Sequence, residues 1–200
     1  MSQRSVILAV EDRLSEAVSR KLLASLNIRI SQILGLKGQG YLQQKAHNLN
    51  LTAKGFPVFM LTDQDKPEQC PPQLIQSWIP GRQNPDFFLR VAVMEVESWV
   101  LADRSGVATL LSIPLHHIPR KTDDIPQPKE FLVSLARSSR KTRLRKEIVP
   151  APGATSKIGP GYNLCLGEFV RTHWNVQRAS SVSESLRRTV DRLRGFAVSQ

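Results

Sequence analysis

The stretch VILAVEDRLSEAV, residues 6–18, joins an apolar strand to an amphipathic helix and is the clearest indication of the fold. Its first five residues are apolar without interruption, which is typical of a strand buried on both faces of a parallel sheet. Asp12 is suited to cap the helix that follows. That helix has an apolar stripe at helical spacing, made of Leu14, Ala17, Val18 and Leu22. A carboxylate, Glu11, therefore stands where a buried strand meets a helix.

The same alternation of strand and helix signals continues to about residue 112. Further strands are expected over residues 28–33, 56–61 and 87–94, and helices over about 41–54, from Pro71 to Trp78, and through 99–101. Strands that alternate with helices imply right-handed crossovers and a mainly parallel sheet. We therefore expect residues 1–112 to form a three-layered, Rossmann-like α/β core with helices flanking the sheet.

Residues 113–200 do not continue the alternation of strand and helix signals. Prolines break the chain into loops at Pro114, Pro119, Pro126 and Pro128. Helices are expected from Pro128 onward, over about 162–174 and over about 183–194, with a loop rich in proline and glycine over 150–161. The sequence therefore predicts a basic, mostly helical C-terminal extension that packs on the core.

The net charge of +11 is concentrated in the second half of the chain. Residues 1–100 carry 11 Lys and Arg against 9 Asp and Glu, whereas residues 101–200 carry 17 against 8. Arginine outnumbers lysine 18 to 10, and its planar guanidinium suits bidentate contacts with phosphate. Nucleic acid is therefore the expected partner, and a solvated basic face is the alternative.

Composition also excludes several classes of protein. With 40% hydrophobic and 22% charged residues the chain reads as globular and not disordered. The apolar run of residues 6–10 is too short for a signal-peptide core, and no apolar stretch is long enough for a membrane helix. Cys70 and Cys165 lie 95 positions apart and form neither a disulfide framework nor a zinc pattern. We therefore expect a cytoplasmic protein that does not interact with membranes.

Carboxylates gather where the expected strands end. Glu11 follows the first strand, Asp63 and Asp65 follow the third, and Glu95 and Glu97 follow the fourth. Ligands of open parallel sheets bind beyond the carboxyl ends of the strands. In extended geometry Asp63 and Asp65 point to the same face. Because clustered carboxylates repel one another unless a cation lies between them, and because oxygen ligands suit hard cations, the sequence predicts a Mg²⁺ or Mn²⁺ site.

All five carboxylates are candidate metal ligands, and all except Glu95 are candidate catalytic residues. Asp63 and Asp65 are expected to hold the metal, Glu11 to orient or deprotonate the attacking water, and Glu97 or Glu95 to complete the coordination shell. Each residue taken singly also has an ordinary structural explanation. Glu11 is suited to pair with a surface lysine, and Glu97 to complement a helix dipole.

The most basic segment of the chain runs from residue 129 to residue 146. Its cations are Lys129, Arg137, Arg140, Lys141, Arg143, Arg145 and Lys146, against one acid, Glu130. Residues 138–143 mix hydroxyl groups with cations, a composition that suits phosphate contacts. We expect this segment to bind nucleic acid, and a solvated helix face is the alternative.

The order of strand, glutamate and helix, followed by a strand and D-x-D, resembles the Toprim domain of topoisomerases, DnaG-type primases, small nuclease-like proteins and OLD nucleases. The matching residues are Glu11, Asp63 and Asp65. Nearly the whole chain resembles a small bacterial Toprim-like family of unknown function, whose members are often suspected partners of AAA or OLD-type ATPases in mobile and defence loci. The carrying segments are EDRLSEAV (11–18), LTDQD (61–65), RVAVMEVESWVLAD (90–103), IPQPKEFL (125–132), GPGYN (159–163) and SLRR (185–188).

This resemblance implies Mg²⁺-dependent phosphodiester cleavage of DNA or RNA, as the effector of a multi-protein antiviral defence system. The alternative is a non-catalytic Toprim-like subunit that docks on a partner ATPase and binds nucleic acid or a phage protein. The glycine-rich stretch 35–40 is not a P-loop, so the ATPase is expected to be a separate protein. Asp12 stands where nucleases of the Toprim group usually have glycine.

Overall fold

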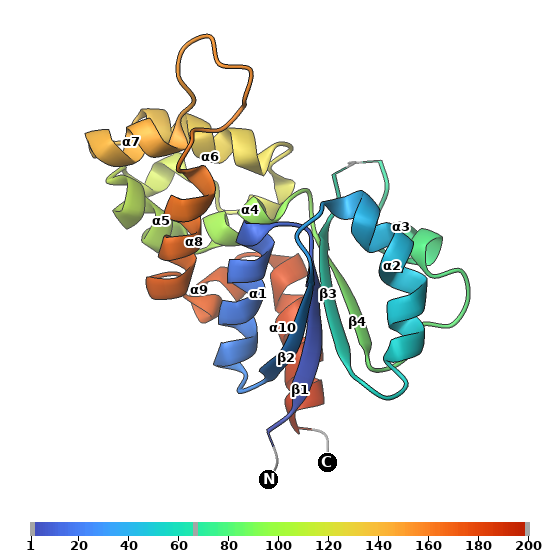
Figure 1. The fold of residues 1–200 in the computed structure, drawn as a ribbon. Helices are drawn as coiled ribbons and strands as arrows, with labels where there is room; N and C mark the ends of the chain where they lie inside the picture. The colour runs from blue at the N-terminus through green and yellow to red at the C-terminus, as the bar shows by residue number, and fades with distance from the viewer. Residues whose placement is uncertain (1–2, 66–67, 199–200) are drawn as a thin grey trace.

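The computed structural model describes residues 3–65 and 68–198, which form a sheet of four parallel strands with helices on both faces (Figure 1). The strand order is β2-β1-β3-β4. The strands are β1 (Ser5–Val10), β2 (Arg29–Gly35), β3 (Val58–Asp63) and β4 (Phe87–Ala92). The expected α/β fold with a mainly parallel sheet and flanking helices is confirmed, and the arrangement is Rossmann-like.

Ten α-helices and two short 3₁₀ helices are present in the described part of the chain. The α-helices are α1 (Arg13–Ser25), α2 (Gln39–Thr52), α3 (Pro71–Trp78), α4 (Val96–Ala102), α5 (Arg104–Leu111), α6 (Pro128–Arg137), α7 (Thr142–Ile148), α8 (Tyr162–Thr172), α9 (Val176–Ser180) and α10 (Glu184–Val198). The 3₁₀ helices are η1 (Leu115–His117) and η2 (Thr122–Asp124). None of these helices has the length and apolar composition needed to cross a membrane.

The sheet separates two apolar layers, because successive side chains of a strand point to opposite faces. Ala9 and Met60 pack with α2 and α3 on one face. Leu8 and Phe59 belong to the larger cluster on the other face, which includes α1 and helices of the second half. Figure 1 shows α2 and α3 on one side of the sheet and α1 and α10 on the other. Burial on both faces explains why the strands read as continuous apolar runs.

The strand order reverses between β1 and β3. The chain passes from β1 outward to β2, then crosses back to β3 on the other side of β1, and continues outward to β4. The helices α1 and α2, which follow β1 and β2, lie on opposite faces. In open α/β sheets, ligands bind beyond the carboxyl ends of the strands at such a switch point.

The residues beyond 113 share one apolar core with the sheet. Tyr162 and Trp174 belong to the same buried cluster as Leu14 of α1. The Phe196 ring of α10 lies 5.0 Å, centroid to centroid, from the Phe88 ring of β4. The indole N–H of Trp99 donates to the Ser185 hydroxyl at 2.7 Å and ties α4 to α10. The C-terminal helices therefore form part of the wall that covers this face of the sheet.

The element ends differ from the expected ones for local reasons. Strand β3 begins at Val58, after the exposed Phe56, and continues to Asp63 because its last residues pair with β4. Strand β4 ends at Ala92, since Met94 has a left-handed φ of 63° that an extended strand excludes. The helices α5, α7 and α9 have 8, 7 and 5 residues and are too short to show a helical period in the sequence.

Candidate active site at the carboxyl ends of β1 and β3

Glu11 and Asp63 meet at the switch point, although 52 positions separate them in the sequence. Strands β1 and β3 pair in parallel with Val10 opposite Leu61, so the residues that follow are also neighbours. Glu11 Oε1 accepts a hydrogen bond from the Asp63 backbone N–H at 2.7 Å and another from the Thr62 hydroxyl. Burial raises the pKa of Glu11, and these two hydrogen bonds counteract part of that rise.

Asp63 is 7% exposed and links the sheet to α4. Its Oδ1 accepts the Val96 N–H at 2.8 Å, at the start of that helix. The Gln39 side-chain amide donates to the Asp63 carbonyl at 2.9 Å and ties the start of α2 to the same point. Burial, followed by the negative charges of Glu97 and Glu11, raises the pKa of Asp63 well above its ordinary value. Asp63 is therefore both a helix cap and a member of a cluster of like charges.

Glu97 is the most buried of the predicted ligands, with 1% exposure. Its Oε1 accepts the Tyr162 hydroxyl at 2.9 Å and lies 3.7 Å from the Lys129 amine. Its Oε2 is buried and has no hydrogen-bond partner among the described residues. Burial is the main cause that raises the pKa of Glu97 to about 7, and Lys129 opposes it. A buried carboxylate oxygen without a partner in the protein is rare, so this oxygen is a candidate donor to a ligand.

Lys129 lies among the acids at the start of α6. Glu95 accepts its backbone N–H at 2.8 Å and lies 3.5 Å from its amine. Burial alone would lower the pKa of Lys129, but the carboxylates of Glu97 and Glu95 together raise it, so the amine is cationic. The amine thus supplies positive charge to the acid cluster, which we define as Glu11, Asp63, Asp65, Glu95 and Glu97.

Asp65 is placed differently from the expectation. The strand ends at Asp63, and Asp65 has a left-handed φ of 58°, so the two side chains do not leave one face of an extended strand. The chain turns there because the N–H groups of Gln64 and Asp65 both donate to the Met94 carbonyl at 3.1 Å. Asp65 is exposed, yet its charge contributes to the raised pKa values of Glu11 and Asp63. It therefore stands at the open side of the acid cluster.

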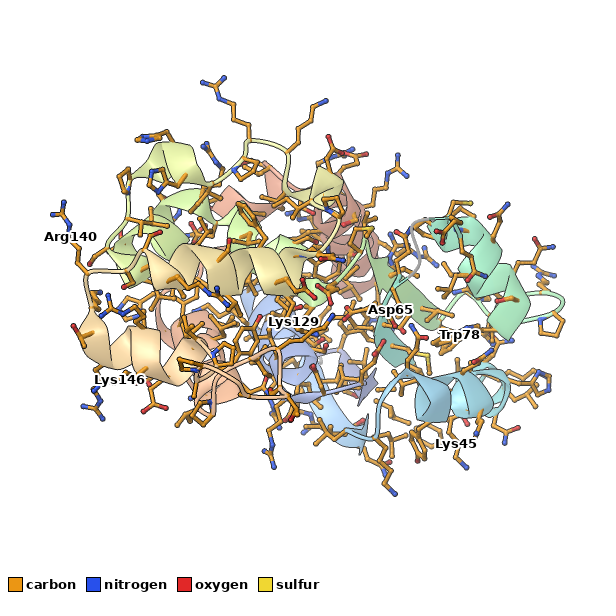
Figure 2. The ribbon with its side chains drawn as sticks, turned by 90° about the horizontal axis from the view of Figure 1, so that it is seen from above. Lys45, Asp65, Trp78, Lys129, Arg140 and Lys146 are labelled. Carbon is orange, nitrogen blue, oxygen red and sulfur yellow. The ribbon has the colours of Figure 1, made fainter. Side chains whose placement is uncertain are left out.

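The predicted nucleic-acid segment divides between two places. Lys129 faces the acid cluster, whereas its six other cations are exposed at the end of α6, in the turn that follows and on α7. Figure 2 shows Asp65 and Lys129 near the middle of the molecule, with Arg140 and Lys146 at the far end of the helical half. The exposed cations are Arg137, Arg140, Lys141, Arg143, Arg145 and Lys146.

Several contacts of the cluster were absent from the sequence prediction. Thr62, Gln39 and Tyr162 all contact its carboxylates or backbone, from positions far away in the chain. Tyr162 begins α8 directly after Gly161, where an added Cβ would collide with the Glu147 side chain. The GPGYN motif therefore delivers a buried hydroxyl to Glu97. Asp12 caps α1, as expected, by accepting the Ser15 N–H at 2.8 Å.

The chemistry of the cluster fits a hard divalent cation. Its donors are carboxylate oxygens, the pKa values of its buried members are raised, and Glu97 Oε2 is unpartnered. In their present positions, the residues described in the structure contain no group of three or more His, Cys, Asp or Glu side chains able to hold a metal ion. The Lys129 amine lies close to Glu95 and Glu97 and partly neutralises their charge, as a bound cation would.

Comparisons with protein-family models, with curated proteins and with solved structures found no match to this chain. The fold and the acid cluster are therefore the features of the molecule that bear on its function.

Proposed function

We propose that this protein is a Toprim-like nuclease that cleaves phosphodiester bonds in nucleic acid and depends on Mg²⁺ or Mn²⁺. The observation that carries the proposal is the group of carboxylates near the switch point of the sheet, of which Asp63 and Glu97 are buried and Glu11 is half-buried. Burying mutually repelling carboxylates is costly for folding, so their presence at a ligand-binding edge supports a functional role. The basic second half supports a polyanionic substrate.

In the proposed mechanism, the residues of the acid cluster have different roles. Asp63 and Asp65 would hold the metal, and Glu95 and Glu97 would complete its shell. A bound divalent cation would polarise the phosphate and lower the pKa of its water. Glu11, fixed through Oε1 by β3, would receive the proton of the attacking water. Lys129 is cationic and faces the same space, so its amine would neutralise charge on a phosphate oxygen.

The sequence resemblance supports the wider context of the proposal. The protein would act in the cytoplasm as the effector of an antiviral defence system, with an AAA or OLD-type ATPase encoded nearby. The substrate would be DNA or RNA, with tRNA among the RNAs to test.

A second function is favoured by one specific observation. The Lys129 amine lies 3.5 Å and 3.7 Å from Glu95 and Glu97, so the cluster holds a cation of its own. Asp63 and Glu95 also accept the backbone N–H groups that begin α4 and α6. A site built this way is suited to a non-catalytic subunit that docks on an ATPase and binds nucleic acid or a phage protein. Such a subunit needs no metal.

The decisive experiment compares purified protein on DNA, RNA and tRNA with Mg²⁺, with Mn²⁺ and with EDTA, in the presence and absence of the candidate ATPase. A nuclease cleaves at least one substrate with metal and none with EDTA. Absence of cleavage under every condition, with binding to the ATPase retained, would replace the nuclease by the docking subunit.

A further inference from the structure

A groove with a volume of about 1250 Å³ lies between α6, α7 and the loop over residues 149–160. The base of the loop is closed, because the Gly159 N–H donates to the Ile148 carbonyl at 2.8 Å and the Gly161 N–H to the Glu147 carbonyl at 3.0 Å. An added Cβ at either glycine would collide with Glu147. Figure 1 shows this loop, in orange, projecting beside α6 and α7. The loop is therefore held in place at its base, and the groove has a preformed shape.

The groove combines cations with apolar walls. Its cations are Arg137 of α6, Arg145 and Lys146 of α7, and Lys157 of the loop. Among the described residues that line it there is one acid, Glu130, which pairs with Lys157 at 2.6 Å. The rest of the wall is mostly apolar and includes Val133, Val149, Pro150 and Pro152. The groove therefore suits a chain that carries negative charge on one side and flat apolar surface on the other.

The first turn of α6 contributes one residue to the groove and the next to the acid cluster. Glu130 lines the groove, and the preceding residue, Lys129, contacts Glu95 and Glu97. Because these two residues are consecutive on α6, one end of the groove lies beside the acid cluster, and a path for a bound chain from the groove to the acids would run past this turn of the helix. The other cations of the basic segment are not part of this path. Lys141, for example, donates from its amine to the Thr109 carbonyl and lines a different pocket.

We infer that this groove binds a single strand of nucleic acid and leads it to the acid cluster, an inference that rests on the proposed nuclease function. Phosphates contact Arg137, Arg145, Lys146 and Lys157, while the unpaired bases and sugars contact the apolar walls. A duplex keeps its bases stacked inside and presents mainly phosphates, so it would leave those walls uncovered. The substrate class is therefore single-stranded DNA or RNA, or an unpaired loop or end of a structured RNA.

Two triple variants with the same change of charge test the path. One replaces the groove cations Arg137, Arg145 and Lys146 by Ala, and its control replaces Arg140, Lys141 and Arg143 by Ala. Binding of a fluorescent oligothymidine is measured by anisotropy over a range of salt concentrations, with circular dichroism to verify folding. Three lost phosphate contacts flatten the slope of log K against log salt by about 2 and weaken binding about a hundredfold at ~0.1 M salt. The control keeps most of the wild-type slope and affinity.

A gain of affinity provides a second test that misfolding does not imitate. Glu130→Gln removes the acid of the groove and releases Lys157 from its ion pair. The variant should bind the oligonucleotide several-fold more tightly, with a slope steeper by up to about 0.7. The matched control is Glu168→Gln, an exposed acid on α8 that does not line the groove. No gain in Glu130→Gln, or an equal gain in both variants, contradicts the groove.

Competitors identify the occupant. If unlabelled duplex DNA competes as well as the single strand, the inference of a single-stranded ligand is overturned. If polyglutamate competes as well as the single strand, the ligand of the groove is an acidic peptide and not nucleic acid. Equal loss of binding in the two triple variants, or no loss in either, would overturn the path itself. The failure of the nuclease proposal looks different. In that case the groove triple binds weakly while wild type cleaves nothing with any metal, and the groove inference reduces to a binding site.

Discussion

Lys129 and Glu130 are consecutive residues of α6, yet their ion pairs belong to two opposite kinds of site. The amine of Lys129 lies 3.7 Å from Glu97, whose side chain is 1% exposed. The carboxylate of Glu130 lies 2.6 Å from Lys157, and these two side chains are 42% and 76% exposed. The shorter pair is the more hydrated one. Distance alone therefore does not rank the two contacts, since burial decides how strongly charges interact.

The same contrast separates the acid cluster from the groove. In the acid cluster, each buried carboxylate has fixed partners, and loss of one partner changes the pKa values of the others. In the groove, the cations are exposed on flexible side chains, so each is expected to contribute a similar, salt-dependent amount. Substitutions in the cluster should therefore change chemistry and pH dependence, whereas those in the groove should change affinity.

The largest expected effect is on cleavage. Asp63→Asn and Glu11→Gln keep an oxygen that accepts the Val96 and Asp63 N–H groups, but remove the charges on which the metal and the attacking water depend. Cleavage should fall on the order of 10³-fold or more, with little change in oligonucleotide binding. Gel assays and anisotropy measure the two quantities side by side.

The control for this pair is Asp86→Asn, an exposed aspartate just before β4, at the opposite end of the sheet. It makes the same chemical change and should leave cleavage at the wild-type rate. Full activity in Asp63→Asn would end the metal-nuclease proposal, and the same loss in Asp86→Asn would trace the effect to general destabilisation.

Much of the fold was predictable from the sequence, because it depends on local patterns. Continuous apolar runs indicated buried parallel strands; Glu11 follows β1 and Asp63 ends β3, the two strands that proved central. The position of Lys129 was not predictable, since seven cations in one segment look alike until α6 turns the first of them inward. Tyr162 and Gln39 were missed for a related reason: their contacts join positions that only the tertiary fold brings together.

The second expected effect is a dependence of stability on pH. The pKa of Glu97 is raised to about 7 from 4.5, so the folded state binds this proton more tightly than the unfolded state. Its contribution is complete below about pH 4.5 and is lost as the pH rises through about 7, which lowers the free energy of unfolding by about 3 kcal/mol. Urea unfolding between about pH 5 and pH 8 measures the change.

Glu97→Gln is the control, since it keeps the size of the side chain and cannot titrate. Its unfolding free energy should vary less with pH than that of wild type. Parallel curves for the two proteins would show that Glu97 is not the titrating group.

The third effect is stabilisation by the metal. Mn²⁺ at about 100 times its dissociation constant should raise the free energy of unfolding by about 2.7 kcal/mol and increase Tm, and Asp63→Ala should abolish this increase. Metal binding would displace protons from Glu11, Asp63 and Glu97, so at one fixed Mn²⁺ concentration the increase should be larger at about pH 8 than at about pH 6. An increase that is unchanged in Asp63→Ala would place the metal elsewhere.

The smallest expected effects come from removing either of the two ion pairs of α6. Lys129→Met leaves Glu95 and Glu97 without their cation, and at about pH 8 it should lower the free energy of unfolding by about 2 kcal/mol. The loss is smaller than for a fully buried ion pair, because a third of the Lys129 side chain is exposed. At about pH 5 the loss should shrink, because Glu97 is then protonated and needs no counter-charge. Lys157→Met removes the shorter pair with Glu130, which is exposed to solvent, and should leave stability almost unchanged at either pH. Urea unfolding of wild type and both variants at the two pH values measures how the loss of stability in each variant depends on pH. Equal losses for Lys129→Met and Lys157→Met, with no dependence on pH, would mean that the fold treats the two pairs alike, and Lys129 would then be one more surface cation of the basic segment.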